Sequence, residues 1–251
     1  STETRCGLPT AYGGDMTLAV LLRDEAAGAE LRLYYTTYPA EDVITRRAEL
    51  VCTGAGLSIR KLMSLSLDLA ERDLKMTTFT GGWIREAHRH DAAVEGTLIN
   101  ESRTGFSSNR ANPGFILSER AADERRGRVW GFNLVYSGNH MSCVSADPRG
   151  TVRVMSGISP DRFEWRLGTG ESFETPEAVM CFSAEGLGGM SRAMHDFVNR
   201  HIVRGPWAGR GRPVLVNAWE GFMFDFDAKR LLSVARRAKA MGAELFVICL
   251  L

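Results

Sequence analysis

The sequence lacks the features that mark several large classes of protein. Its 251 residues carry 31 basic and 30 acidic side chains, a formal net charge of +1. Such a balance gives no electrostatic footprint for nucleic acid or for an anionic membrane surface. No apolar run approaches the roughly 20 residues of a membrane span, and the first residues contain no apolar stretch of a secretory signal. We therefore predict no nucleic-acid or membrane partner, and a cytoplasmic location.

Cysteine is sparse, and it is arranged without a recognisable pattern. The five cysteines are widely spaced, odd in number and mostly flanked by apolar residues: Cys6, Cys52, Cys143, Cys181 and Cys249. No Cys-x-x-Cys pair is present, which argues against a thiolate metal site. Isolated cysteines of this kind are typically buried thiols in a reducing compartment. We predict that the chain holds neither a metal nor a cofactor.

The sequence contains repeated β-alternation from residue 29 to about residue 183. Every second residue is apolar in the run 63–69, and Trp130, Phe132 and Leu134 alternate in the same way. Gly, Pro, Asn and Asp cluster between these runs, as turns require; the clusters lie at residues 53–56, 112–114, 147–150 and 168–170. Many short strands with little helical periodicity between them predict a mainly β fold, a sandwich of antiparallel sheets.

The pattern changes at Glu185 and predicts a different architecture for the end of the chain. A helical run covers residues 192–201, and a connection rich in Gly, Pro and Arg follows at residues 204–213. We therefore predict three parts: a β-supersandwich domain over 1–185, a helical linker over 186–211, and a third part over 212–251.

The third part has the pattern of a strand, a helix and a second strand. Residues 214–216 are apolar and β-branched, which predicts a strand buried on both faces. Asp227 can cap the following helix, and Gly242 stands where a left-handed residue ends it. Residues 245–248 form the second strand. This order predicts the first β-α-β unit of an incomplete (β/α)8 TIM barrel.

Trp219 is the residue that we expect to bind substrate. It follows the first predicted barrel strand, and barrel active sites are assembled at that end of the strands. Its indole offers a flat apolar face for the C–H face of a sugar ring and one N–H donor. The alternative is that Trp219 only fills the junction between the sandwich and the barrel.

Other candidate sites have simpler explanations. His88 and His90 have a spacing that can bind a metal from a strand, but neighbouring arginines oppose a cation. Asp225 and Asp227 resemble a carboxylate pair, yet Asp227 is explained as a helix cap. The basic residues of the last helix fit an exposed outer face, and the glycines at 186–189 lack the Lys-Ser/Thr of a phosphate loop.

Several runs together resemble the alpha-galactosidases of glycoside hydrolase family 36. They lie in consistent order along nearly the whole chain: DVITR at 42–46, SLSLD at 64–68, GFNLVYSGN at 131–139, ESFETPEA at 171–178, EGLGGMS at 185–191, RGPW at 204–207 and RPVLVNAWE at 212–220. The resemblance implies hydrolysis of terminal α-galactosides such as raffinose-type sugars, with retention and without a metal. It also implies a homo-oligomer, a catalytic barrel and Trp219 in the galactose subsite.

The resemblance also identifies residues of the family that this sequence lacks. Where the family carries Asp-Asp-Gly-Trp-Phe, this sequence has ICLL at 248–251, and the family's nucleophile and acid/base aspartates belong to later barrel strands. The chain also departs from the family at 109–113, at Ala218 and at Gly221. We therefore expect no catalytic residue in this chain and no turnover by it alone. The alternative is a non-catalytic carbohydrate-binding or oligomerisation module.

Overall fold

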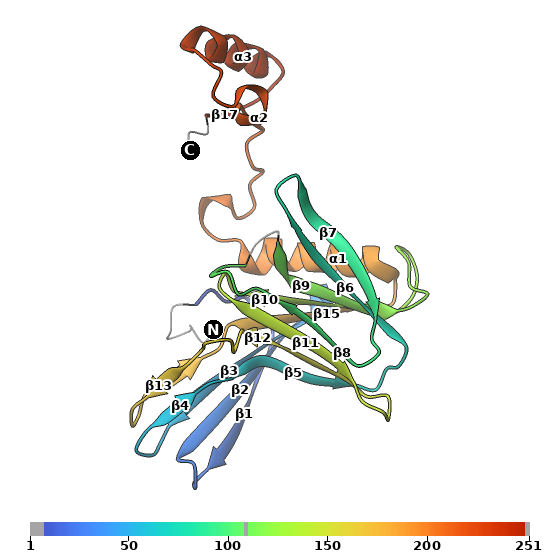
Figure 1. The fold of residues 1–251 in the computed structure, drawn as a ribbon, viewed down its shortest axis with the longest axis vertical. Coiled ribbons are helices and arrows are strands. Elements are labelled where there is room, and N and C mark those ends of the chain that lie inside the picture. The colour runs from blue at the N-terminus through green and yellow to red at the C-terminus, as the bar shows by residue number, and fades with distance from the viewer. Residues whose placement is uncertain (1–7, 108–109, 249–251) are drawn as a thin grey trace. The chain divides into compact units, whose positions relative to one another are not determined.

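The computed structural model describes residues 8–107 and 110–248 and divides the chain into two compact units, residues 1–202 and 203–251 (Figure 1). The division falls inside the predicted linker 186–211, and the bounds of the three predicted domains stay a prediction. In the described part of the chain, no helix is long and apolar enough to cross a membrane. Cys6, Asn109 and the run 249–251 lie outside the described residues.

The first unit is built on a nine-stranded sheet whose neighbouring strands are antiparallel, which confirms the prediction of a mainly β fold with antiparallel sheets. Its strands, in spatial order, are β1 (Thr17–Asp24), β2 (Ala29–Tyr38), β3 (Val43–Cys52), β15 (Glu177–Ser183), β10 (Val129–Val135), β9 (Ala111–Glu119), β6 (Leu74–Gly82) and β7 (Arg85–Ala93), with β14 (Ser172–Glu174) beside β3.

Two further antiparallel sheets complete this unit. The larger contains, in order, β5 (Met63–Leu69), β12 (Val152–Ile158), β11 (His140–Ala146) and β8 (Thr97–Glu101). The smaller pairs β13 (Trp165–Leu167) with β4 (Leu57–Ile59). Short helical turns lie at η1 (Pro39–Glu41) and η2 (Val198–Ile202).

The main core lies between the nine-stranded and four-stranded sheets. Phe132 and Leu134 are buried in it and Trp130 packs against it, as their alternation predicts. Phe115 of β9 stacks on Phe132 of β10 with ring centroids 4.8 Å apart and 8° between the ring planes. A second cluster contains Cys181, which is buried and free like Cys52 and Cys143. Burial raises the pKa of the Cys181 thiol to about 11. All three are buried and free, as the sequence predicts.

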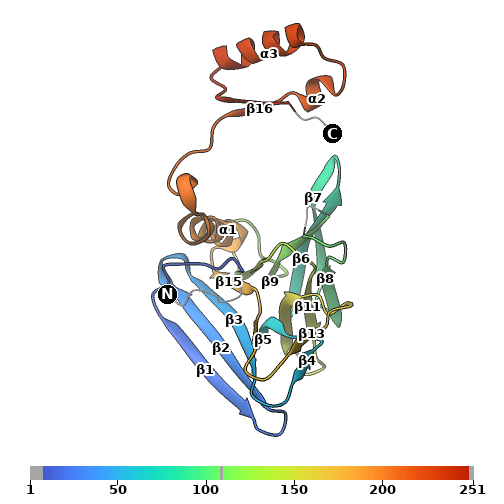
Figure 2. The ribbon, with the colours of Figure 1, turned by 90° about the vertical axis from the view of Figure 1, so that its left-hand side faces the viewer.

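Helix α1 (Gly186–Phe197) packs over β10 and β15 and begins six residues before the predicted start (Figure 2). Its first amides donate to backbone carbonyls of the preceding loop: Leu187 N to Asp123 O at 2.9 Å, and Gly188 N to Glu124 O at 3.0 Å. A Cβ on Gly188 would lie 2.7 Å from Glu124 O, so only glycine allows this approach. These loop contacts thus extend the helix into a glycine run, although the glycines by themselves disfavour helix formation.

The second unit contains a parallel pair of strands and two helices. After η3 (Gly205–Trp207), strand β16 (Leu215–Asn217) pairs with β17 (Leu245–Val247), and α2 (Trp219–Phe222) and α3 (Ala228–Ala240) lie between them in the chain. Asp227 Oδ1 accepts from Arg230 N at 2.7 Å, and Gly242 has φ +95°, so both predicted ends of the helix are confirmed.

One prediction about this unit is wrong. Residues 214–216 were expected to form a strand buried on both faces, but Val214 and Leu215 are exposed. A strand is buried on both faces only when layers cover both sides of its sheet. Among its described residues the unit supplies one partner strand and two helices, which is too little to cover two faces.

Candidate functional site

Trp219 lies where the sequence places it, directly after the parallel strand β16, as the first residue of α2. Two hydrogen bonds fix the backbone before it. Ala218 N donates to Val247 O at 2.9 Å, and Trp219 N donates to Asn217 Oδ1 at 3.0 Å. The carboxyl ends of β16 and β17 are therefore held together at the position from which the indole projects.

The half-buried indole of Trp219 has one aromatic neighbour from the next loop. Phe224 meets it edge-on, with ring centroids 5.0 Å apart and planes at 90°. Nearby, the Arg230 guanidinium lies 4.6 Å from the centre of the Phe222 ring. An edge-on contact orients an aromatic ring without covering both of its faces, so the indole keeps the means to stack on an apolar ligand face.

The carboxylates between α2 and α3 are already engaged. Asp225 Oδ2 pairs with Arg230 Nη1 at 2.8 Å, and Asp227 caps α3 through the backbone amide of the same residue. Each side chain has a structural partner, and a single arginine residue contacts both. This arrangement explains the two aspartates as loop and helix supports, and it gives neither the task of an acid or a base.

The remaining predicted candidates lie on exposed surfaces. His88 and His90 are exposed on β7, where Arg89 Nε pairs with Asp91 Oδ1 at 2.9 Å. The Arg89 guanidinium holds the pKa of the Asp91 carboxyl below its usual range. Over residues 8–107 and 110–248, no group of three His, Cys, Asp or Glu side chains is arranged to hold a metal ion. The basic side chains of α3 are also exposed: Lys229, Arg230, Arg236, Arg237 and Lys239.

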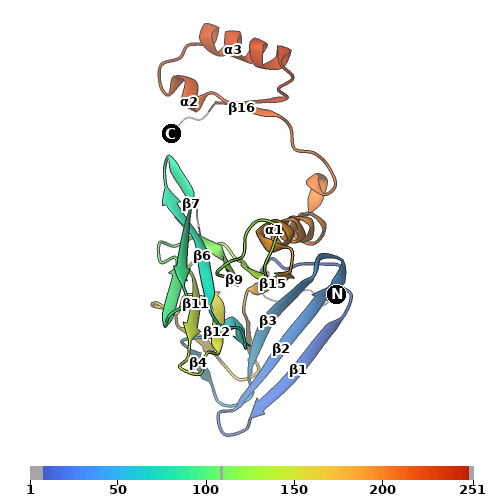
Figure 3. The ribbon, with the colours of Figure 1, turned by 90° about the vertical axis from the view of Figure 1, so that its right-hand side faces the viewer.

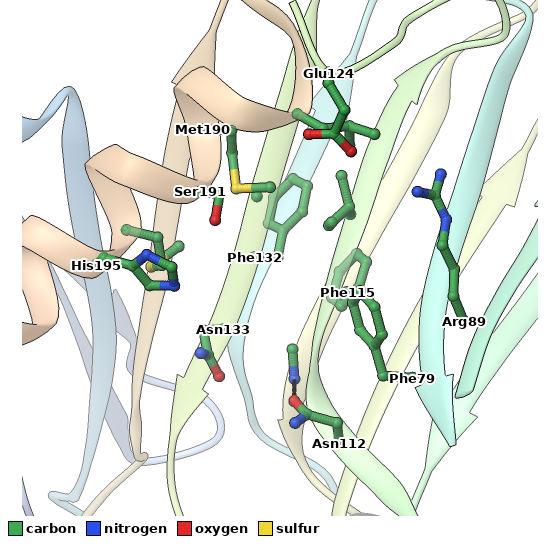
Figure 4. Close-up of a pocket in the computed structure, with 15 residues that line it drawn as sticks. Phe79, Arg89, Asn112, Phe115, Glu124, Phe132, Asn133, Met190, Ser191 and His195 are labelled. Carbon is green, nitrogen blue, oxygen red and sulfur yellow. Dashed lines mark hydrogen bonds between the residues drawn. The ribbon is translucent and has the colours of Figure 1, made fainter. Parts of the chain in front are cut away.

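The first unit contains a groove that the sequence analysis did not find. It has a volume of about 410 Å³ and lies between α1 and strands β6, β7, β9 and β10 (Figure 4). Gly131 of β10 brings the helix close, because a Cβ there would lie 2.5 Å from Met190 Sδ. The sequence contains one indication of this groove: Met190 and Met194 are four residues apart and therefore share a helix face.

The groove combines aromatic carbon with polar groups from several elements. Phe79 of β6 lies across from the helix, while Asn112 of β9, Asn133 of β10 and His195 of α1 line the space between (Figure 4). Asn112 Oδ1 accepts from Gly114 N at 2.8 Å, which fixes the orientation of its amide. The lining also includes the charged side chains Arg89 and Glu124. An apolar wall with several polar groups is suited to a polar ligand that also has an apolar face.

Comparison with known proteins gives consistent results along the chain. The model of the glycosyl hydrolase family 36 N-terminal domain matches residues 2–168, and the melibiase model matches residues 172–249. Alpha-galactosidase AgaA of Geobacillus stearothermophilus is 40% identical over 248 residues, which cover 96% of this chain and 34% of that protein. Alpha-galactosidase C of Emericella nidulans is 38% identical over 247 residues, covering 96% and 33%.

Solved structures give the same result. A variant of the Geobacillus AgaA in complex with stachyose has a TM-score of 0.90 and 39% identity, covering 96% of this chain and 34% of that one. Another AgaA variant, in complex with raffinose, has a TM-score of 0.89 and 38% identity over the same shares. The chain thus spans about a third of the length of the relatives that it matches. By the match over residues 2–168 and the fold that these relatives share, the chain belongs to glycosyl hydrolase family 36.

Proposed function

We propose that this chain is the amino-terminal part of a retaining alpha-galactosidase that acts on terminal α-galactosides of the raffinose type. The family membership supports this, as do the stachyose and raffinose complexes of its relatives. We further propose that β16, α3 and β17 are the first β-α-β unit of a (β/α)8 barrel. The observation that carries the proposal is an aromatic platform directly after a parallel strand, within the segment that the melibiase model matches.

Trp219 then contributes one wall of the galactose subsite. The C–H face of a galactose ring stacks on the indole, and the indole N–H is available to a hydroxyl. Phe224 holds the ring edge-on, so the platform is oriented before the sugar arrives. Ordering the ring in advance lowers the entropic cost of binding.

Catalysis needs more than this platform. A retaining glycosidase places two carboxyl groups about 5–5.5 Å apart across the scissile bond. Asp225 and Asp227 are the aspartates nearest to Trp219 in the sequence, and both are held by Arg230. We infer that the chain alone binds galactosides without hydrolysing them, and that later barrel strands supply the nucleophile and the acid/base residue.

The first test is an assay of the purified chain with a chromogenic α-galactoside. We expect no turnover, while extending the chain with the remaining two-thirds of the Geobacillus relative restores hydrolysis. In the extended protein, Trp219→Ala lowers kcat/KM. The loss corresponds to about 1–3 kcal/mol of transition-state stabilisation, the scale expected for a lost aromatic platform. Trp165→Ala, at an exposed position on β13, is the matched control and leaves kcat/KM unchanged. Equal activity of the two variants would reduce Trp219 to a packing residue.

The groove beside α1 favours a second candidate function, a non-catalytic carbohydrate-binding module. Its polar lining and aromatic wall suit a neutral oligosaccharide. Titration of the chain with raffinose separates the two candidates. Binding that Trp219→Ala removes supports the barrel subsite. Binding that Asn133→Ala removes, with Trp219→Ala inert, supports the module.

A further inference from the structure

Among residues 8–107 and 110–248, strand β1 is one edge of the nine-stranded sheet, and β7 is the other. Strand β1 pairs on one side with β2, in unbroken register from Thr17 opposite Thr36 to Asp24 opposite Ala29, and Figure 3 shows it at the outer margin of the blue strands. Natural edge strands are protected by shortness, proline, lysine or a bulge. This one is eight residues long, contains neither proline nor lysine, and pairs without a register shift.

One face of this edge is apolar and uncovered. Leu18, Val20 and Leu22 share it, and their cross-strand partners on β2 are the apolar or aromatic residues Tyr35, Leu33 and Leu31. Leu18 is 59% exposed and Leu22 is 50% exposed, and Met16, just before the strand, is 64% exposed. A continuous apolar surface of this kind marks an interaction site.

The opposite face carries the exposed Leu21 together with charged side chains that pair with one another within the chain. Glu30 of β2 pairs with Arg23 at 3.0 Å and with Arg32 at 2.7 Å, and Arg32 reaches Glu49 of β3 at 3.4 Å. The Arg32 side chain lowers the pKa of the Glu30 carboxyl. A partner therefore gains its apolar contacts on the other face and its backbone hydrogen bonds along the edge.

The sequence of this edge is complementary to itself when one copy runs antiparallel to the other. Residues 15–23 read DMTLAVLLR, and pairing two copies about Ala19 sets Leu18 opposite Val20. The same register sets Met16 opposite Leu22, so every residue of the apolar face meets an apolar residue. It also sets Asp15 opposite Arg23 at both ends, which joins opposite charges. Two-fold symmetric interfaces require self-complementarity of this kind.

We propose that β1 pairs with β1 of a second copy of this chain, antiparallel and centred on Ala19, so that the nine-stranded sheets of two copies join edge to edge. Each copy donates and accepts the hydrogen bonds that the other edge lacks. The proposal concerns the first unit alone and is independent of any catalytic role. The competing explanations are cover by other segments of a longer protein, and association through the apolar end of the second unit.

Charge reversal tests the register directly. In sedimentation experiments at low salt on the full chain, wild type shows a concentration-dependent step from monomer to dimer, separate from any larger assemblies that form through the end of the chain. Asp15→Arg alone sets arginine against arginine, and Arg23→Asp alone sets aspartate against aspartate. Since both end pairs change from attractive to repulsive, each single variant weakens dimerisation by about tenfold or more.

Mixing the two single variants provides the decisive result. In the mixed pair both ends join arginine to aspartate, so equimolar mixing restores the dimer, as does the double variant D15R/R23D. Arg166→Asp, a reversal at an exposed site on β13 (side chain 83% exposed), leaves the equilibrium unchanged. All variants keep the end of the chain, so association through that end would be the same in each. A monomeric wild type, or a mixture no more associated than its components, overturns the proposal.

Discussion

The two units of this chain bury their apolar side chains to very different extents. The first contains three clusters of buried residues, and its largest surrounds Phe115, Leu117 and Phe132 between two sheets. In residues 203–248, the buried apolar residues are two alanines, Ala218 and Ala238, while large side chains such as Phe224 are exposed. The first unit thus has a complete core, whereas the second has regular secondary structure with little core beneath it.

The difference shows that local signals and burial are separable. In the second unit the cap at Asp227, the left-handed Gly242 and the parallel pairing of β16 with β17 are all present. Caps and propensities each contribute about 1 kcal/mol or less, while most helical stability in proteins comes from packing. We expect the first unit to dominate the measured stability of the chain.

The largest effect that we predict compares the same substitution in the two units. Leu117→Ala, at a position with no exposed surface, removes core contacts and should lower the free energy of unfolding by about 2–5 kcal/mol. Leu232→Ala, on α3 where the side chain is 54% exposed, should change it by about 0.5 kcal/mol at most. Denaturant unfolding followed by circular dichroism measures both. Similar losses would show that the second unit has a core of its own.

The next prediction concerns pH and the buried His140 of β11. Burial lowers the pKa of this imidazole below 6.5, against the opposing effects of the Gly138 and Asn112 backbone and the Glu101 carboxylate. As the pH falls below about 6.5, the unfolded chain takes up this proton before the folded chain does. The stability due to His140 is therefore present above that pH and is lost towards the lower pKa of the folded state.

The slope from one such group is at most about 1.4 kcal/mol per pH unit. We expect His140→Gln to flatten the acid side of the stability profile by a measurable part of this value, whatever its effect at neutral pH. His90→Gln, on the exposed face of β7, is the matched control and keeps the wild-type slope. An unchanged slope in His140→Gln would mean that the ring is hydrated in solution.

A smaller effect is expected from the cap of α3. Asp227→Ala removes the acceptor for Arg230 N and should destabilise the helix by about 1 kcal/mol. Because the second unit has little core, the loss should appear as local fraying and leave the main unfolding transition in place. Hydrogen exchange of the amides of residues 228–232 measures it. Asp225→Ala serves as the control because the exposed Asp225 carboxylate pairs with the Arg230 side chain and not with the Arg230 backbone amide.

The smallest change in stability should follow the largest change in the chain. Ending it after Gly205 removes most of the second unit and should alter the free energy of unfolding of the first by about 0.5 kcal/mol at most. Light scattering should show loss of larger assemblies, since Leu245 and Ile248 present an exposed apolar end. The run 249–251 of that end lies outside the described residues. A shortened chain as polydisperse as the full one would assign the aggregation to another surface.

Much of the fold could be predicted because its signals are local. Alternation at Trp130, Phe132 and Leu134 predicts the side that faces the core, and the turn clusters separate the strands. The early start of α1 could not be predicted, because it depends on carbonyl groups at Asp123 and Glu124, some 60 residues earlier in the sequence. The exposure of Val214 could not be predicted for the same reason, because the burial of a strand depends on segments elsewhere in the chain that pack against it.

The candidate site shows the same limit. Trp219 could be found because its place after a strand is a property of the neighbouring sequence. The groove beside α1 could not, since Phe79, Asn112, Asn133 and His195 come from four separate elements that only the folded sheet and helix bring together.

The seating of α1 has a consequence for how this domain tolerates mutation. The helix is located by its backbone, through the carbonyls of Asp123 and Glu124 and the close approach at Gly188. Apolar residues beneath it, such as Met190, can then vary in shape without shifting the helix along its axis. A single methyl group at Gly188 has no such latitude, because it meets a carbonyl oxygen. Substitutions should therefore be tolerated at the methionines and removed by selection at Gly188, although the methionines make the larger contacts.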